Sequence, residues 1–116
     1  MADQPQAAFA GSNSAVPSRI RFDRKELDLI LRIYGRLVAE GECRDYAIGT
    51  FGDHAIFCMH KRASEAPSWT VEKRPELAKR QGAYSVANST GQILRRGHDL
   101  EQVMKVFEKK RFHVVS

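Results

Sequence analysis

Residues 83–109 constrain the fold most strongly because two structural periodicities follow one another there. The segment 88–91 (Asn-Ser-Thr-Gly) is typical of a tight turn, and apolar side chains at strand spacing flank it: Tyr84, Val86 and Ile93. Asp99 then stands where it can cap a helix. Apolar residues follow it at i, i+3, i+4 and i+7: Leu100, Val103, Met104 and Phe107. The segment therefore predicts a β-hairpin that leads directly into an amphipathic helix.

A second strong signal opens an earlier helix at residues 22–27. Asp23 can accept a hydrogen bond from the amide three residues on, and Glu26 can reach back to the Asp23 amide. Phe22 and Leu27 occupy the positions of a hydrophobic staple. We expect this helix to continue to about Glu40 and to end at Gly41.

The apolar face of this first helix is wider than one sheet face requires. One stripe consists of Leu27, Ile30, Leu31, Tyr34 and Val38, and a second stripe beside it consists of Leu29, Ile33 and Leu37. Two interpretations account for the second stripe. Either the helix is sandwiched between other elements, or Leu29, Ile33 and Leu37 form the face of a homodimer or bind another protein.

Short alternating runs between the two helices predict strands at 45–51, 54–62 and 69–74. Residues 75–82 read as a loop, and 111–116 as a short added strand or a frayed end. The order of elements predicts an α+β fold. We expect an N-terminal helix, a four- to five-stranded antiparallel meander and a C-terminal helix, with both helices on one sheet face.

The composition predicts one domain in a chain of 116 residues. Residues 1–19 contain few large apolar groups and are expected to be a disordered tail, so the domain comprises 20–116. The chain has no apolar run of about 18 residues and no signal-peptide pattern, which favours a cytoplasmic protein without a membrane partner. In that compartment Cys43 and Cys58 are expected to be free thiols, with Cys58 in the core.

Positive charge is concentrated in the second half of the chain. Residues 1–60 carry a formal charge of −1 and residues 61–116 carry +6. Basic residues at predicted strand ends could converge on one rim and bind an anionic partner, most plausibly RNA or DNA: Lys73, Arg74, Lys79, Arg80, Arg95 and Arg96. Trp69 and Tyr84 could stack on unpaired bases. The alternative is that adjacent strand residues divide this charge between two faces, or that the cations only protect sheet edges.

The sequence offers little support for catalysis or for a cofactor. Cys43, His54, Cys58 and His60 lack the paired spacing of structural zinc sites, so no metal and no cofactor are expected. A thiol–imidazole pair of Cys58 and His60 would need an accessible thiolate. A weaker enzymatic hypothesis places a pocket near Arg74, Tyr84 and His98. We expect a non-enzymatic binding module.

Three blocks of the sequence resemble a known family. These are residues 71–75 (Val-Glu-Lys-Arg-Pro), residues 80–86 (Arg-Gln-Gly-Ala-Tyr-Ser-Val) and residues 96–100 (Arg-Gly-His-Asp-Leu). With the helix start at 22–27 and Tyr34-Gly35-Arg36, they resemble the domain of unknown function 2794 family over about 22–110. The resemblance implies a bacterial cytoplasmic protein, largely from alphaproteobacteria. It brings no activity, ligand or catalytic residue.

Overall fold

The structure is a computed structural model that describes residues 19–115, with the side chains of 19–108. Along the described chain, one long helix comes first and another last, with five strands and one short 3₁₀ helix between them. The elements are α1 (Arg24–Ala39), β1 (Asp45–Thr50), β2 (Ala55–His60), β3 (Trp69–Lys73), η1 (Pro75–Leu77), β4 (Tyr84–Asn88), β5 (Ile93–Gly97) and α2 (Leu100–Val115).

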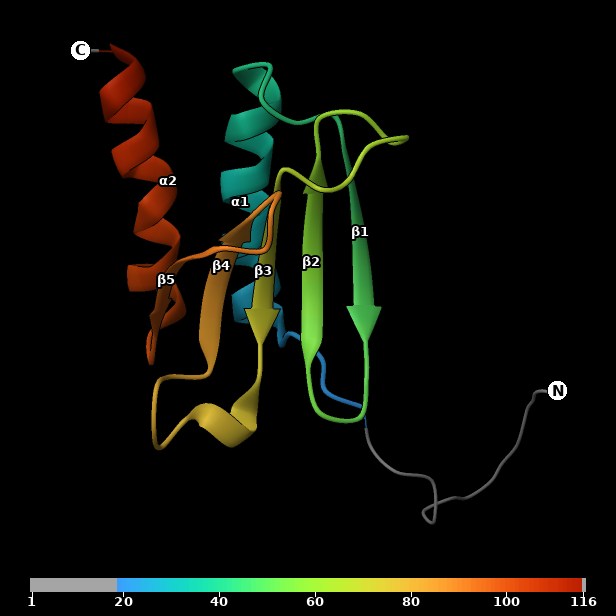
Figure 1. Ribbon diagram of the computed structural model, residues 1–116, viewed down its shortest axis with the longest axis vertical. Helices are drawn as coiled ribbons and strands as arrows, with labels where there is room; N and C mark the ends of the chain where they lie inside the picture. Colours follow the sequence, from blue (N-terminus) through green and yellow to red (C-terminus); the bar gives the residue numbers. More distant parts are fainter. Residues whose placement is uncertain (1–18, 116) are drawn as a thin grey trace, which may run out of the picture.

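The strands form one antiparallel sheet in the order β1-β2-β3-β4-β5, so each strand pairs with its neighbours in sequence. Both helices lie on the same face of this sheet, and β1 and β5 are its edges (Figure 1). The predicted α+β meander is therefore confirmed. The expected tail at 1–19 lies outside the described residues except for Arg19.

The predicted start and end of α1 are confirmed. The Asp23 side chain accepts from the Glu26 amide at 2.8 Å, and the Glu26 carboxylate accepts from the Asp23 amide at 2.7 Å. Glu40 is the C-terminal cap, and Gly41 follows with a φ of 80°, a conformation that favours glycine.

The predicted hairpin and its helix are also confirmed, but the helix is longer than expected. The Asn88 side-chain oxygen accepts from the amides of Thr90 and Gln92 and thereby closes the turn. The Asp99 carboxylate accepts from the Glu101 amide at 3.0 Å at the start of α2. The prediction of a short strand at 111–116 is wrong for residues 111–115, because α2 continues to Val115 and no Gly or Pro interrupts it.

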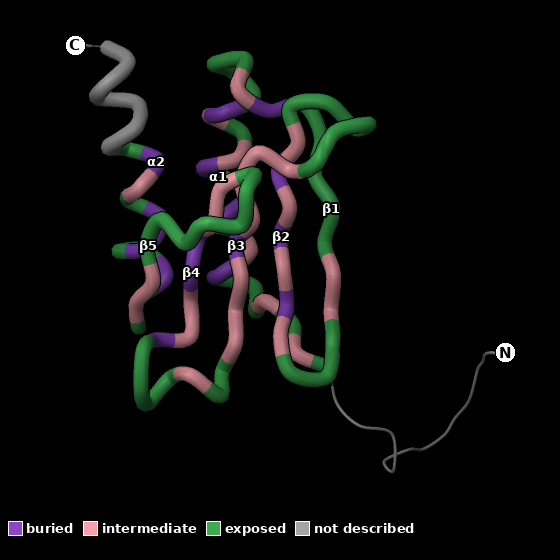
Figure 2. Tube along the Cα trace, in the orientation of Figure 1, coloured by how far each residue is buried: buried purple, intermediate pink, exposed green. Residues whose placement is uncertain are grey.

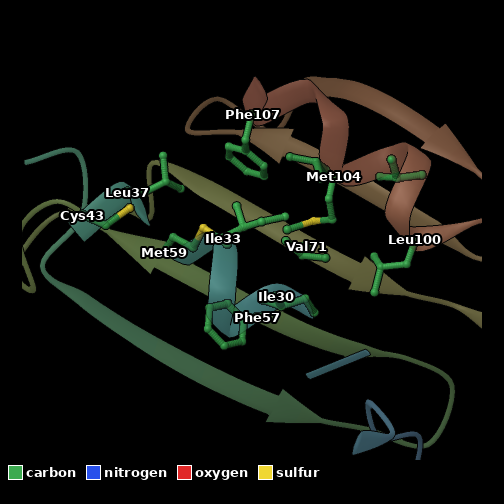
Figure 3. Close-up of a cluster of buried hydrophobic side chains, with 12 residues drawn as sticks. Ile30, Ile33, Leu37, Cys43, Phe57, Met59, Val71, Leu100, Met104 and Phe107 are labelled. Atoms are coloured by element: carbon green, nitrogen blue, oxygen red, sulfur yellow. The ribbon is translucent and has the colours of Figure 1, made fainter. Parts of the chain in front are cut away.

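The core lies between the sheet and the two helices, where side chains from the sheet and from both helices converge (Figure 3). Ile33 and Leu37 of α1 are only 6% and 4% exposed, so their assignment to a dimer face is corrected. Leu29 is half-buried and packs against the same core. The second apolar stripe is occupied within the chain because α1 packs against both the sheet and α2.

Candidate functional site

Lys73 forms an ion pair in a partly buried position, although the sequence suggested a free cation. Its Nζ donates to Glu26 Oε1 at 2.8 Å and to the Arg21 carbonyl oxygen at 2.8 Å. The side chains of Lys73 and Glu26 are only 18% and 10% exposed. Since Glu26 neutralises the ammonium group, Lys73 has little charge left for an external anion.

The two aromatic residues that were expected to stack on bases are occupied inside the molecule. The Tyr84 hydroxyl donates to Glu26 Oε2, and the pKa of Tyr84 is raised by burial and by this carboxylate. The Trp69 ring packs edge-on against Phe107, with centroids 5.5 Å apart. Trp69 pairs with Asn88 and Tyr84 with Lys73, so the two rings lie at opposite ends of β3.

Arg74 is also neutralised. Its guanidinium donates to Asp53 at 3.0 Å and to Glu72 at 3.2 Å, and Glu76 lies 3.7 Å away. These contacts raise the pKa of Arg74, with the Glu72 hydrogen bond as the largest cause. The pKa of Asp53 is lowered, chiefly by a hydrogen bond with His54 and further by Arg74.

The other four predicted anion-binding residues point in different directions. Lys79 and Arg80 are exposed beyond η1. Arg95 pairs with the core residue Val86 and donates to the Gln102 carbonyl of α2, so it lies on the helix side. Arg96 is its neighbour on β5 and therefore lies on the open face. The six cations do not form one basic surface, and this arrangement corrects the expectation of a common rim.

Arg96 differs from its neighbour in its surroundings. Its Nη1 is buried and has no hydrogen-bond partner among the described residues. It pairs across the sheet with Ser85, which is 1% exposed. The group is a buried donor on the open face, and nothing described beside it identifies a ligand.

A hollow of about 430 Å³ lies between the starts of the two helices. Tyr84 and His98 line it together with carboxylates that include Glu26 and Asp99. Arg74 is not among its lining residues and instead reaches Asp53 and Glu72. The predicted pocket of Arg74, Tyr84 and His98 is therefore not assembled.

The buried thiol is Cys43 and not Cys58, which was the one expected in the core. Cys43 is 1% exposed, and burial raises its pKa to about 11. Cys58 pairs with Ala47 on the open face and is half-buried, so the prediction of a core Cys58 is wrong. The reason is the strand alternation, which gives the core side of β2 to Phe57 and Met59. Within the described residues, no three His, Cys, Asp or Glu side chains are grouped to hold a metal ion.

One basic cluster does come together, at the other end of the sheet. Arg44, Lys61 and Arg62 line a shallow hollow of about 280 Å³ together with Asp45. All three cations are exposed. The sequence alone does not place Arg44 beside Lys61 and Arg62, because the two segments become neighbours only through the pairing of β1 with β2.

Exposed apolar side chains gather beside the first edge strand. Val38, Tyr46 and Ile48 are 42%, 44% and 45% exposed, and the Tyr34 ring packs edge-on against Tyr46 at 5.1 Å. We call these four residues the α1–β1 surface. Figure 2 shows β1 mostly exposed beside β2, whose residues alternate between buried and half-buried. The alternation of side chains along β1 could not identify this surface from the sequence, because the surface is exposed only since β1 lies at the edge of the sheet.

The outer side of β1 also carries unpaired backbone groups. The Phe51 amide donates to the His54 carbonyl at 2.9 Å, which marks that pair as hydrogen-bonded. Alternate residues toward the start of the strand, Gly49 and Ala47, therefore also bond to β2. The amide and carbonyl groups of Tyr46 and Ile48 point outward. The Tyr46 amide donates to Asp45 Oδ1 at 2.9 Å, and no described residue pairs with the other three groups.

The fold defines a small α+β protein with two helices on one face of an antiparallel meander and an edge strand, β1, that exposes apolar side chains. Residues 20–104 match the sequence pattern of a family described as Protein of unknown function (DUF2794), and the chain belongs to that family. Comparison with curated proteins and with solved structures gave no match. In the described part of the chain, neither helix combines the length and apolar character needed to cross a bilayer.

Proposed function

We propose that this protein is a protein-binding module that binds another polypeptide through the α1–β1 surface. The observation that carries the proposal is the coincidence of exposed Tyr46 and Ile48 side chains with their outward backbone groups on one edge strand. An edge strand of this kind can accept an added strand, whose backbone supplies affinity and whose side chains supply specificity. Exposed apolar groups beside that edge favour burial by a partner.

The opposite edge strand, β5, also exposes apolar side chains, since Ile93 and Leu94 are 46% and 40% exposed, but it carries protection against strand pairing that β1 lacks. β5 has a register irregularity opposite Val86 and Ala87, and it carries the adjacent cations Arg95 and Arg96. Bulges and cations are the usual protection against unwanted strand pairing. β1 pairs regularly along its whole length and contains one charged residue, Asp45. The contrast supports β1 as the edge that binds.

A photo-reactive amino acid at position 48 tests the proposal in cells that naturally produce the protein. We expect a cross-linked polypeptide from position 48 and none from position 90, since Thr90 is exposed in the distant β4–β5 turn. Mass spectrometry then identifies the attached chain. A normally folded and expressed protein that gives no adduct at position 48 would contradict the proposal.

A second candidate function is the binding of an anionic polymer, with RNA or DNA as the partner. The observation that favours it is the hollow lined by Arg44, Lys61 and Arg62, whose charges exceed that of the adjacent Asp45. Cations in such a cluster can displace counterions from phosphates, which gives a salt-dependent affinity.

Two charge-reversed variants separate this cluster from the loop that the sequence analysis favoured. Binding to a single-stranded RNA and a duplex DNA is measured by gel shift at two salt concentrations. We expect Lys61→Glu with Arg62→Glu to lower the affinity by about tenfold or more, and Lys79→Glu with Arg80→Glu to lower it less. Absence of binding by the wild type at low salt would contradict this candidate.

A further inference from the structure

We infer that the occupant of the β1 edge is a second copy of this chain, paired antiparallel about Ala47. This inference rests on the proposed function and names its partner. In such a pair the two copies present the same strand to each other, which makes a closed two-fold interface. The backbone groups available on β1 and the side chains beside them select both the partner and the register.

The outward backbone groups fix the register. Thr50 also points outward, but its carbonyl oxygen already accepts from Arg19 Nη1 at 2.7 Å, and the next carbonyl, that of Phe51, accepts from the Ile20 amide. At the other end of the strand, the Arg44 amide donates to the His60 carbonyl of its own chain. The Tyr46 amide donates to the exposed side chain of its neighbour Asp45, so the groups left open are the Tyr46 carbonyl and the Ile48 amide and carbonyl.

A two-fold axis at Ala47 uses all of these open groups, and the Tyr46 amide exchanges the exposed Asp45 carboxylate for the partner's Ile48 carbonyl. Tyr46 of one copy then lies opposite the partner's Ile48, and the reverse pair follows by symmetry. Both are hydrogen-bonded pairs, so each exchanges two amide–carbonyl bonds, as in any antiparallel ladder. A register centred on Ile48 would need both the Tyr46 amide and the Thr50 carbonyl, which Arg19 occupies, so it would break one more existing hydrogen bond in each copy.

The same register gives complementary side chains. On the helix side, each exposed Tyr46 ring packs beside the partner's Ile48, an aromatic and β-branched pair that stabilises antiparallel strands. On the open face, two Ala47 methyl groups meet at the axis without crowding. The pairing therefore covers Tyr46 and Ile48, which are exposed on β1 in the single chain.

The charges on the strand also permit self-pairing. Asp45 lies opposite the partner's Gly49, and Arg44 lies opposite the partner's Thr50, so no like charges face each other. A strand with a central Lys or Asp would repel its own copy. The two sheets would join into one continuous sheet, with all four helices on the same side.

A cysteine at position 47 tests both the partner and the register in the full-length chain. The two Ala47 residues form a non-hydrogen-bonded pair about 4.5 Å apart, which a disulfide can span. Cys58 is first replaced by Ala, because it pairs directly with Ala47 and would compete within the chain. Cys43 is kept, since it is 1% exposed. We expect Ala47→Cys to give a disulfide-linked dimer under mild oxidation.

Two matched cysteine variants serve as controls. Thr90→Cys in the same background should remain monomeric on a non-reducing gel, because the β4–β5 turn lies away from the interface. Ile48→Cys should link less efficiently than Ala47→Cys, because the two copies of position 48 lie diagonally across the axis. More efficient linking through position 48 would overturn the register about Ala47.

Sedimentation of the protein without added cysteines provides the independent measurement. We expect the wild-type mass to be that of a dimer, and Ile48→Lys to shift it to that of a monomer with an unchanged circular-dichroism spectrum. A monomeric wild type overturns the inference. A dimer that Ile48→Lys does not dissociate, and in which Ala47→Cys forms no disulfide under oxidation, also overturns it. If a monomeric wild type still gives an adduct with a different protein at position 48, the proposed function stands and the second copy does not.

Discussion

At the residue scale, the Glu26 side chain connects three separate parts of the molecule. Its carboxylate accepts from the Asp23 amide, from Lys73 and from Tyr84, and it is 9% exposed. It joins the start of α1 to the end of β3 and the start of β4. A carboxylate in this position is structural, because its hydrogen-bonding capacity is used within the chain.

Glu26→Gln should destabilise the fold through Lys73. The amide cannot neutralise an ammonium group that is only 18% exposed, so we expect a loss of about 2 to 3 kcal/mol in the free energy of unfolding. Urea titration measures this loss. Glu76→Gln is the control, because Glu76 contacts Arg74 at 3.7 Å on the surface and should cost less than about 0.5 kcal/mol. Equal losses would contradict the structural role.

Cys43 should make the protein sensitive to alkaline pH. The thiol has a pKa of about 11 when folded and an ordinary value of 9.0, so its neutral form is favoured in the folded state. Its contribution to stability is complete below pH 9 and decreases as the pH rises from 9 to 11. The decrease amounts to roughly 2 to 3 kcal/mol. Tyr34 and Tyr84 also have raised pKa values, which act in the same direction.

Denaturant titration between pH 8 and pH 11 measures this effect. Cys43→Ala is expected to be less stable than the wild type at pH 8, because it leaves a cavity in the core. Its stability should nevertheless fall less steeply than that of the wild type above pH 9. Parallel curves for the two proteins would show that the Cys43 thiol does not carry the pH dependence.

At the element scale, local signals predicted the helices and the hairpin well. Asp23 with Glu26, and Asn88 with Gly91, act over three residues, so their chemistry is visible in the sequence. The ion pair of Lys73 with Glu26 joins residues 47 positions apart and depends on where α1 crosses the sheet. For that reason the sequence identified Lys73 as basic but could not show that its charge is neutralised.

Gly82 illustrates a second long-range requirement. Its φ is +103°, and a Cβ at this position would overlap the backbone of Gly97 at the end of β5. Gly82→Ala should therefore lower the free energy of unfolding by more than about 2 kcal/mol. Gly91→Ala is the matched control, with a φ of +86° and open space around it, and should cost about 1 kcal/mol. Equal costs, measured by thermal unfolding, would contradict the close approach.

At the scale of the whole molecule, the net charge of +5 does not produce the common basic rim that we expected from the sequence. Lys73 and Arg74 are paired with acids, and Arg95 and Arg96 lie on opposite faces of the sheet. Composition counts charges but does not place them, and the meander distributes adjacent residues between two sides. The surface that the fold leaves open is instead the apolar edge at β1.

Residue-resolved amide hydrogen exchange tests the binding edge most directly, in dilute and in concentrated protein. The amides of Ala47 and Gly49 bond to β2 and should be protected at both concentrations. The Ile48 amide has no described partner, and the Tyr46 amide donates only to the exposed Asp45 carboxylate. We predict that both exchange rapidly in dilute protein and become protected as the concentration rises. Rapid exchange of both amides at every concentration, with Ala47 and Gly49 still protected, would contradict pairing of this edge with a second copy.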